Sequence, residues 1–230
     1  MPNWVYNDLT IEGHPDSVAK LKAQVSKPFK VPFRAIGDLH YKAESVSYDN
    51  PVFAFWNIVA PKDLEAYCKV GDREGMKDPY MWYNWNNRIW GVKWDVAVAN
   101  NEKDSITKLV RDEPNGENHV LVYTFNTPWG IPDGALLWLS VTYPDLLFTL
   151  QYEEENGWGG EHEYLRGLQL EGSFYNWKCC ECDYAETGKE PYCEACEDMV
   201  CPSCGYQSGW SELDSCPLHV VESDPIEEKV

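Results

Sequence analysis

The feature that most constrains the fold of this chain is a series of closely spaced metal-ligand pairs in its last quarter. Four pairs, each with a two-residue spacer, lie within 41 residues: Cys179 and Cys182, Cys193 and Cys196, Cys201 and Cys204, and Cys216 and His219. A two-residue spacer lets a tight turn direct both side chains at one ion, and Zn²⁺ takes four such ligands in a tetrahedron. The eight ligands predict two structural zinc sites in a segment that folds on metal-binding energy.

The pairing of these ligands is open. Spacers of 10, 4 and 11 residues separate the four pairs, so residues 179–196 and 201–219 could form two sequential zinc ribbons. An interleaved cross-brace, in which the first and third pairs share one ion, fits the same spacing, as does a single site with spare thiols. We favour sequential ribbons, and Cys179 over Cys180 as the first ligand because it keeps the two-residue spacer. Eight protein ligands leave no open coordination position, which indicates structural zinc.

Length and composition suit one medium domain and one small one. The chain has 230 residues, 43% of them hydrophobic and 11 of them Trp. No apolar run reaches the roughly 20 residues that span a bilayer, and the first residues lack the pattern of a signal peptide. We therefore expect a cytoplasmic protein. In that reducing compartment clustered cysteines are metal ligands more often than disulfides, and only Cys68 and Cys180 fall outside the ligand set.

The net charge of −19 limits the classes of molecule that this chain is expected to bind. Residues 177–230 hold 3 Lys against 13 acidic residues, and the remainder of the chain is acidic too. Nucleic acids and anionic membranes require a basic surface, so neither is an expected partner. The charge serves solubility in the simplest interpretation. In a more specific one it engages a basic protein by imitating DNA phosphates.

Hydrophobic periodicity predicts an α+β protein. Apolar residues alternate along 4–13 and again along 92–99, 119–125 and 146–152, which is typical of half-buried strands. Helical spacing follows Pro15 up to Pro28, and again over 62–70 and 132–143. Residues 161–176 are expected to add an edge hairpin.

The order of these segments is strand, helix, long insertion, strand, strand, helix, strand. This order predicts a ferredoxin-like βαββαβ sheet, with the insertion at about residues 28–90. We therefore expect an α+β domain over 1–176, a zinc module with two structural sites over 177–220, and an acidic tail over 221–230.

Several aromatic blocks resemble a known family. The blocks are residues 2–13, 85–95, 127–132, 143–148 and 152–157, which include Trp85-Asn86-Asn87-Arg88-Ile89-Trp90 and Thr127-Pro128-Trp129-Gly130. In this order they resemble the YubB-like proteins of phages and plasmids over most of residues 1–165. Departures occur at Val92 and at Gly130-Ile131-Pro132, and the cysteine pairs lie outside the match. The resemblance implies a ferredoxin-like domain and a mobile-element origin, and it implies no catalytic residue.

The same aromatic blocks supply the candidate partner-binding residues. Tyr, Trp and Arg are the side chains that anchor protein interfaces, and asparagines between the rings argue against a wholly buried segment. The alternative is that most of these rings pack the core of the insertion. The candidates are Trp82, Tyr83, Trp85, Arg88, Trp90, Trp129 and Trp158.

Catalytic patterns are weaker. Glu153, Glu155, Glu161 and His162 could hold Mg²⁺ or Mn²⁺ for phosphodiester cleavage, although a solvated charged loop explains them as well. A zinc-ribbon nucleic-acid binder would have to overcome the acidity of the ribbon segment. The leading hypothesis is a non-enzymatic accessory protein that binds a host or phage protein. One alternative is a DNA mimic that inhibits a basic nuclease or restriction enzyme. Another is that the chain is itself a metal-dependent nuclease.

Overall fold

The computed structural model describes residues 2–32, 34–36, 40–42, 45–68, 77–100, 106–170, 172–175, 177–178, 185–186, 192–193 and 198–199. The chain divides into two compact units. Unit 1 comprises residues 1–152 and 161–172, and unit 2 comprises residues 153–160 and 173–230. The acidic tail expected over 221–230 lies outside the described residues.

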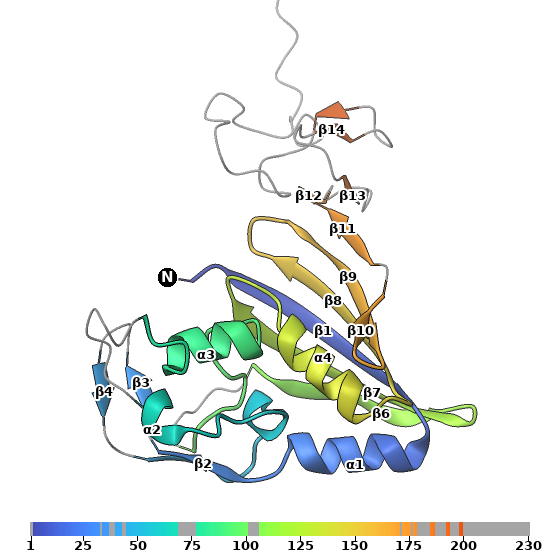
Figure 1. Ribbon diagram of the computed structural model, residues 1–230. Helices are drawn as coiled ribbons and strands as arrows, with labels where there is room; N and C mark the ends of the chain where they lie inside the picture. Colours follow the sequence, from blue (N-terminus) through green and yellow to red (C-terminus); the bar gives the residue numbers. More distant parts are fainter. Residues whose placement is uncertain are drawn as a thin grey trace, which may run out of the picture. The chain divides into compact units, whose positions relative to one another are not determined.

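The fold is built on a seven-stranded sheet with the order β10-β9-β8-β1-β7-β6, in which β11 also pairs with β9 (Figure 1). Strand β1 pairs antiparallel with β7, and β7 with β6, so the chain is an α+β protein with a mostly antiparallel sheet. The bounds are β1 (Trp4–Gly13), β6 (Lys108–Asn115), β7 (Asn118–Pro128), β8 (Leu147–Glu154), β9 (Gly159–Leu165), β10 (Leu168–Gln169) and β11 (Ser173–Tyr175).

Strand β1 has one buried and one open face, as its alternating sequence predicts. Val5, Leu9 and Ile11 are fully buried, whereas Tyr6 is half exposed. Side chains of a strand alternate between its two faces, so the odd-numbered residues line the core and the even-numbered ones face away from it. Within the described residues, β1 therefore contributes its odd-numbered side chains to the core.

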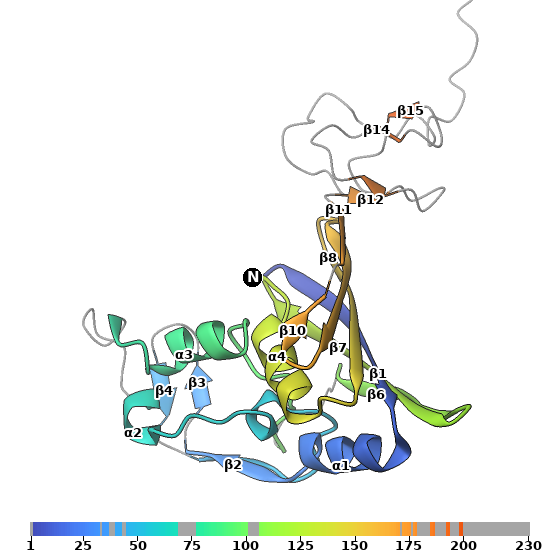
Figure 2. The same ribbon diagram turned by 45° about the vertical axis from the view of Figure 1, so that its right-hand side comes forward.

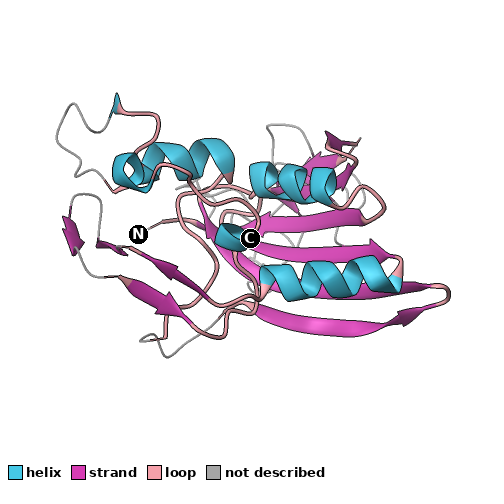
Figure 3. Cartoon of the chain, turned by 60° about the horizontal axis from the view of Figure 1, so that its bottom comes forward, coloured by secondary structure: helices cyan, strands magenta, loops and turns pink. Residues whose placement is uncertain are grey.

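Two helices predicted from periodicity are confirmed, α1 (Pro15–Val25) and α4 (Asp133–Thr142). Pro15 opens α1, where a missing N–H costs nothing, and Val18, Leu21 and Val25 form its buried stripe. Figure 3 shows both helices on the same face of the sheet. The buried side chains of β1, β7 and β8 therefore form the core between this face and the helices.

The insertion between α1 and β6 packs on the helix-covered side of the sheet (Figure 2). Its contact with the sheet is aromatic: the ring of Phe53 lies 4.9 Å from Tyr123 and 5.7 Å from Phe125, both on β7. Its elements are β2 (Phe29–Val31), β3 (Arg34–Ile36), β4 (His40–Lys42), β5 (Val46–Tyr48), the 3-10 turn η1 (Phe55–Asn57), α2 (Leu64–Tyr67) and α3 (Trp82–Ile89). Strand β2 pairs with β5, and β3 with β4.

The expected strand over 92–99 is wrong, and β6 takes its place in the sheet. Side chains satisfy the backbone of 92–99: Asn86 donates to the Lys93 carbonyl (2.8 Å) and Thr107 donates to the Val96 carbonyl (2.6 Å). Val92 and Val96 are buried there without a strand partner. The insertion therefore extends beyond residue 90. Strand β6 escaped prediction because nearly all of its side chains are exposed, so it shows no apolar alternation.

Helix predictions within the insertion were less accurate. A helix was expected over 62–70, and the structure has the four-residue helix α2 within this range. Residues 69 and 70 lie outside the described part of the chain. Helix α3 was not predicted, because Trp, Tyr and Asn have modest helix propensity. Packing of its rings, rather than propensity, stabilises this helix.

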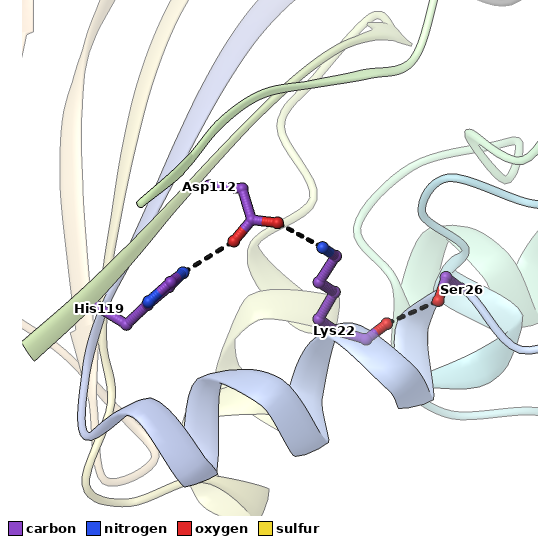
Figure 4. A network of polar contacts seen from close by, with 4 residues as sticks. All are labelled: Lys22, Ser26, Asp112 and His119. Carbon is purple, nitrogen blue, oxygen red and sulfur yellow. Dashed lines mark hydrogen bonds and ion pairs between the residues drawn. The ribbon is translucent and has the colours of Figure 1, made fainter. Parts of the chain in front are cut away.

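A polar network joins α1 to the β6–β7 hairpin (Figure 4). The Asp112 carboxylate of β6 forms an ion pair with Lys22 of α1 and contacts Nε2 of His119 on β7 at 2.7 Å. Ser26 Oγ donates to the Lys22 carbonyl and so satisfies a backbone acceptor in the last turn of α1. Lys22 and His119 lower the pKa of Asp112 because both favour its charged form.

Unit 2 contains two short hairpins beyond β11. Strand β12 (Trp177–Lys178) pairs with β13 (Ala185–Glu186), and β14 (Tyr192–Cys193) pairs with β15 (Asp198–Met199). The predicted zinc ligands lie outside the described residues, apart from the backbone of Cys193. The two zinc sites therefore stay a prediction.

Candidate functional site

Helix α3 divides the aromatic block into a buried and an exposed face. Trp82, Trp85 and Trp90 are 4%, 7% and 1% exposed, which corrects the expectation that they form a contact surface. Trp85 packs edge-on against Tyr67 and Trp90, and the Trp90 indole N–H donates to the Val59 carbonyl at 3.0 Å. These three rings are the core of the insertion.

The opposite face of α3 is open. Its exposed residues are Tyr83, Asn87 and Arg88, and Tyr80 just before the helix is exposed too. Their spacing in the sequence places them in one stripe along this face. The Arg88 guanidinium lies over the Tyr80 ring, 5.5 Å from its centroid. The stripe combines aromatic area with a cation.

Lys93 extends this stripe through its ammonium group. Its side chain is almost entirely buried, and Nζ lies over the rings of Trp94, Trp129 and Tyr83, at 4.7, 5.0 and 5.6 Å from their centroids. Aromatic faces attract a cation at these distances, and the attraction strengthens as water is excluded. Lys93 thus holds together rings from three segments of the chain.

Trp129 is the most unusual residue of this cluster. It has φ 62°, in the left-handed region that a bulky side chain rarely adopts, yet its ring is 51% exposed. Its backbone N–H donates to the Asn3 carbonyl at 2.9 Å. Strained backbone persists only where surrounding contacts hold it, and it clusters at functional sites.

Buried hydrogen bonds from the sheet hold the Trp129 loop. The side-chain amide of Asn7 on β1 donates to Thr127 Oγ1 at 2.9 Å. Thr127 Oγ1 in turn donates to the Gly130 carbonyl at 2.6 Å. Asn7 Nδ2 also lies 2.8 Å from the Val5 carbonyl, while its Oδ1 has no partner among the described residues. The loop conformation is therefore held by a buried residue of the adjacent strand β1.

Two glycines bring α3 against the Trp129 loop. Gly91 has φ 89°, and a Cβ on Gly134 would lie 2.2 Å from the Ile89 carbonyl oxygen. The Ala135 N–H donates to the Trp90 carbonyl at 3.2 Å. The end of α3 and the start of α4 thus meet backbone to backbone, which places Trp129 next to the exposed stripe.

We name this assembly the aromatic–lysine surface. It unites two of the predicted contact residues on α3 with Trp129 and adds three residues that sequence reasoning missed. Its members are Tyr80, Tyr83, Arg88, Lys93, Trp94 and Trp129. Lys93 was missed because a single lysine in a loop carries no signal until the rings around it are placed.

Trp158 belongs to unit 2, and the other candidates belong to unit 1. Within unit 2 its ring lies 6.5 Å from Phe174. Trp158 is therefore not a member of the aromatic–lysine surface.

Two residues of the alternative metal site, Glu161 and His162, lie side by side in sequence on β9 and point away from each other. Glu161 accepts from Gln151 at 2.8 Å on the open face, whereas His162, the next residue, faces the helix side and contacts Asp133 and Tyr164. Adjacent residues of a strand point to opposite faces, so these two side chains diverge. Among the described residues, no three His, Cys, Asp or Glu side chains gather as a cluster that could hold a metal ion.

His162 instead belongs to a hydrogen-bonded network in the core. Its Nε2 lies 3.1 Å from the Tyr152 hydroxyl and its Nδ1 3.3 Å from the Tyr164 hydroxyl, which donates to Asp133. Burial raises the pKa of Tyr152 to about 12, so this phenol keeps its proton at neutral pH. The network satisfies buried polar groups between β8, β9 and α4.

Comparisons with known proteins add little to this geometry. The chain matches no family model and no curated protein. It is similar to the crystal structure of protein api92 from Yersinia pseudotuberculosis, described as DUF1281, at 12% identity and a TM-score of 0.49. The match covers 76% of this chain and 98% of that one. Within the described part of the chain, no helix combines the length and apolar character needed to cross a membrane.

Proposed function

We propose that this chain is a non-enzymatic accessory protein of a phage or plasmid that binds a host or phage protein through its aromatic–lysine surface. The observation that carries the proposal is Trp129: its ring is half exposed while its backbone is held at φ 62°. Keeping a bulky residue in that conformation costs on the order of 1–3 kcal/mol. A fold that needed Trp129 only for packing would bury the ring.

The surface has the properties of an interface anchor. Tyr, Trp and Arg dominate the binding energy of protein interfaces, and preorganised side chains lose little entropy on binding. Lys93 restrains the Trp129, Trp94 and Tyr83 rings before any partner arrives. The exposed rings are therefore held in a binding-ready arrangement.

The scaffold of this surface is, in our proposal, a ferredoxin-like domain related to the YubB-like proteins. The strand order β8-β1-β7-β6, with β1 antiparallel to β7 and with α1 and α4 on one face, supports this assignment. It corresponds to two βα halves that interleave in one sheet.

We propose further that the C-terminal segment binds two structural zinc ions. Two hairpins support this proposal, because Cys179 and Cys182 fall between β12 and β13, while Cys193 ends β14 and Cys196 falls between β14 and β15. A cysteine pair at the turn of a hairpin is the arrangement that a zinc knuckle requires. Such a module would offer the partner a second, rigid contact surface.

The test compares two tryptophans of similar exposure. Tagged full-length protein and the variants Trp129→Ala and Trp138→Ala are used to capture partners from a nuclease-treated bacterial lysate, followed by mass spectrometry. Trp138, 47% exposed on α4, is the matched control for Trp129, which is 51% exposed. We expect a stoichiometric protein that wild type and Trp138→Ala retain and that Trp129→Ala loses. Equal recovery by all three proteins would exclude the aromatic–lysine surface as the binding site.

A further inference from the structure

The aromatic–lysine surface differs in charge from the rest of the protein. Residues 77–94, which contain α3 and Lys93, hold three basic residues and one acidic residue, and the loop 126–132 holds no charged residue. The chain as a whole carries −19. The surface is therefore a locally basic region of a strongly acidic protein.

Three carboxylates lie close in sequence to this surface, and each accepts hydrogen bonds. Asp78 accepts from the backbone N–H of Tyr80 at 2.9 Å. Asp95 accepts from the backbone N–H groups of Phe55 and Trp56 at 2.9 and 2.8 Å. Asp133 accepts from the Tyr164 hydroxyl and lies 3.4 Å from His162. The Arg88 guanidinium lies over the Tyr80 ring, 5.5 Å from its centroid. Arg88 lies in the last turn of α3 with its guanidinium exposed.

We infer that the aromatic–lysine surface takes an acidic segment of its protein partner, in which Asp or Glu lies next to an apolar side chain. This inference rests on the proposed function and specifies the partner. The apolar side chain of the segment packs on the exposed Trp129 ring. Its carboxylate binds the Arg88 guanidinium, which can form two parallel hydrogen bonds with it. A basic partner, which the overall charge suggests, would meet the exposed Arg88 guanidinium here and be repelled.

Charge complementarity also decides between a peptide and nucleic acid. Single-stranded nucleic acid would stack on the same rings, but every phosphate outside the small basic region would face an acidic protein. A short acidic segment places only one or two charges in the basic region. The surface therefore favours the peptide.

The experiment selects ligands without assuming their identity. A displayed library of random 12-residue peptides is panned on the full-length protein and counter-selected on full-length Trp129→Ala. Peptides that depend on Trp129 are then synthesised and titrated against wild type, Trp129→Gly, Arg88→Gln and Lys20→Gln. Glycine adopts φ 62° without steric strain, so Trp129→Gly removes the ring and adds no backbone strain at this position. Lys20 is an exposed lysine of α1 and is the charge-matched control for Arg88.

We expect the selected peptides to be net negative and to pair Asp or Glu with an apolar residue. Loss of an anchoring Trp weakens binding by about 30-fold, the equivalent of 2 kcal/mol. Arg88→Gln weakens binding several-fold and reduces its salt dependence, whereas Lys20→Gln leaves both unchanged.

The outcomes separate the two proposals. Neutral or basic peptides that depend on Trp129, or equal effects of Arg88→Gln and Lys20→Gln, would overturn the acidic-segment inference and leave the binding surface standing. Tighter binding of a 20-nucleotide oligo-dT than of any selected peptide would replace the peptide with nucleic acid. No Trp129-dependent ligand of any kind would remove the proposed function itself.

Discussion

At the residue scale, Asn7 connects the sheet to the candidate site. Its side chain is 2% exposed and donates toward the carbonyls of Val5 and Phe125 and the hydroxyl of Thr127. A buried polar group of this kind contributes through the partners it satisfies, since each loses its water on folding. The geometry of the Trp129 loop therefore depends on a buried residue of β1.

Replacing Asn7 tests this dependence. Asn7→Ala leaves buried acceptors without a donor, and we expect the free energy of unfolding to fall by about 2 kcal/mol. Urea denaturation followed by tryptophan fluorescence measures the loss. Asn118→Ala is the control, because Asn118 is exposed and its side-chain amide donates to the exposed face at Glu12 Oε1, 3.2 Å away. A loss no larger than that of the control would show that the network does not stabilise the fold.

At the element scale, α3 and α4 meet through glycine backbone. A Cβ on Gly134 would lie 2.2 Å from the Ile89 carbonyl oxygen, and its other near neighbours are also backbone atoms that no side-chain rotation can move. Alanine normally stabilises a helix relative to glycine by up to about 1 kcal/mol. Here the close approach of the two backbones makes alanine destabilising relative to glycine.

We expect Gly134→Ala to destabilise the protein by about 1–3 kcal/mol, in the range of overpacked cores. Gly130→Ala is the matched control, since its Cβ would meet only the Gly91 carbonyl oxygen at 3.8 Å. Thermal and urea unfolding of both variants measure the difference. A stabilising Gly134→Ala would contradict the close contact between the two helices.

The polar network of Figure 4 also acts at the element scale, because it joins α1 to β6 and β7. The pKa of Asp112 is lowered in the folded protein. Its contribution to stability is therefore complete above the unfolded pKa of about 3.9, and it is lost as the pH falls through the lower, folded pKa.

Asp112→Asn should lower the free energy of unfolding near pH 7 by about 0.2–1 kcal/mol, the usual value of a solvent-screened pair. The difference from wild type should vanish at pH values below the folded pKa of Asp112 and shrink at about 1 M salt. Urea denaturation between pH 2 and 8 follows both trends. A difference that is constant over this pH range would show that Asp112 acts through packing rather than charge.

At the scale of the whole molecule, the two units are expected to respond differently to metal removal. Zinc-binding energy is folding energy for a small module, whereas unit 1 has its own apolar core between the sheet and its helices. Chelation should therefore unfold residues 177–220 and leave the N-terminal sheet intact.

Metal analysis of the purified protein should give two Zn²⁺ per chain, and Cys68→Ser should leave this number unchanged because Cys68 lies outside the ligand pairs. Backbone NMR before and after chelation identifies the residues that unfold. Loss of dispersed signals from β1 and β7 on chelation would contradict independent folding of the two parts.

The sequence by itself determined those elements whose periodicity is strong and local. Strands β1, β7 and β8 and helices α1 and α4 each bury one regular face, so their apolar spacing shows in the chain. The predicted exposure of Tyr83, Arg88 and Trp129 also agrees with the structure.

Only the tertiary structure decided the rest. Strand β6 carries no apolar pattern because its pairing with β7 uses the backbone, and the alternating segment 92–99 is buried by side-chain hydrogen bonds instead of a sheet partner. Trp82, Trp85 and Trp90 could not be told from Tyr83 and Trp129 by residue type, since aromatic rings suit cores and interfaces equally. Which ring is buried depends on long-range contacts such as the Trp90–Val59 hydrogen bond and the Lys93 cluster, and these form only when distant segments meet.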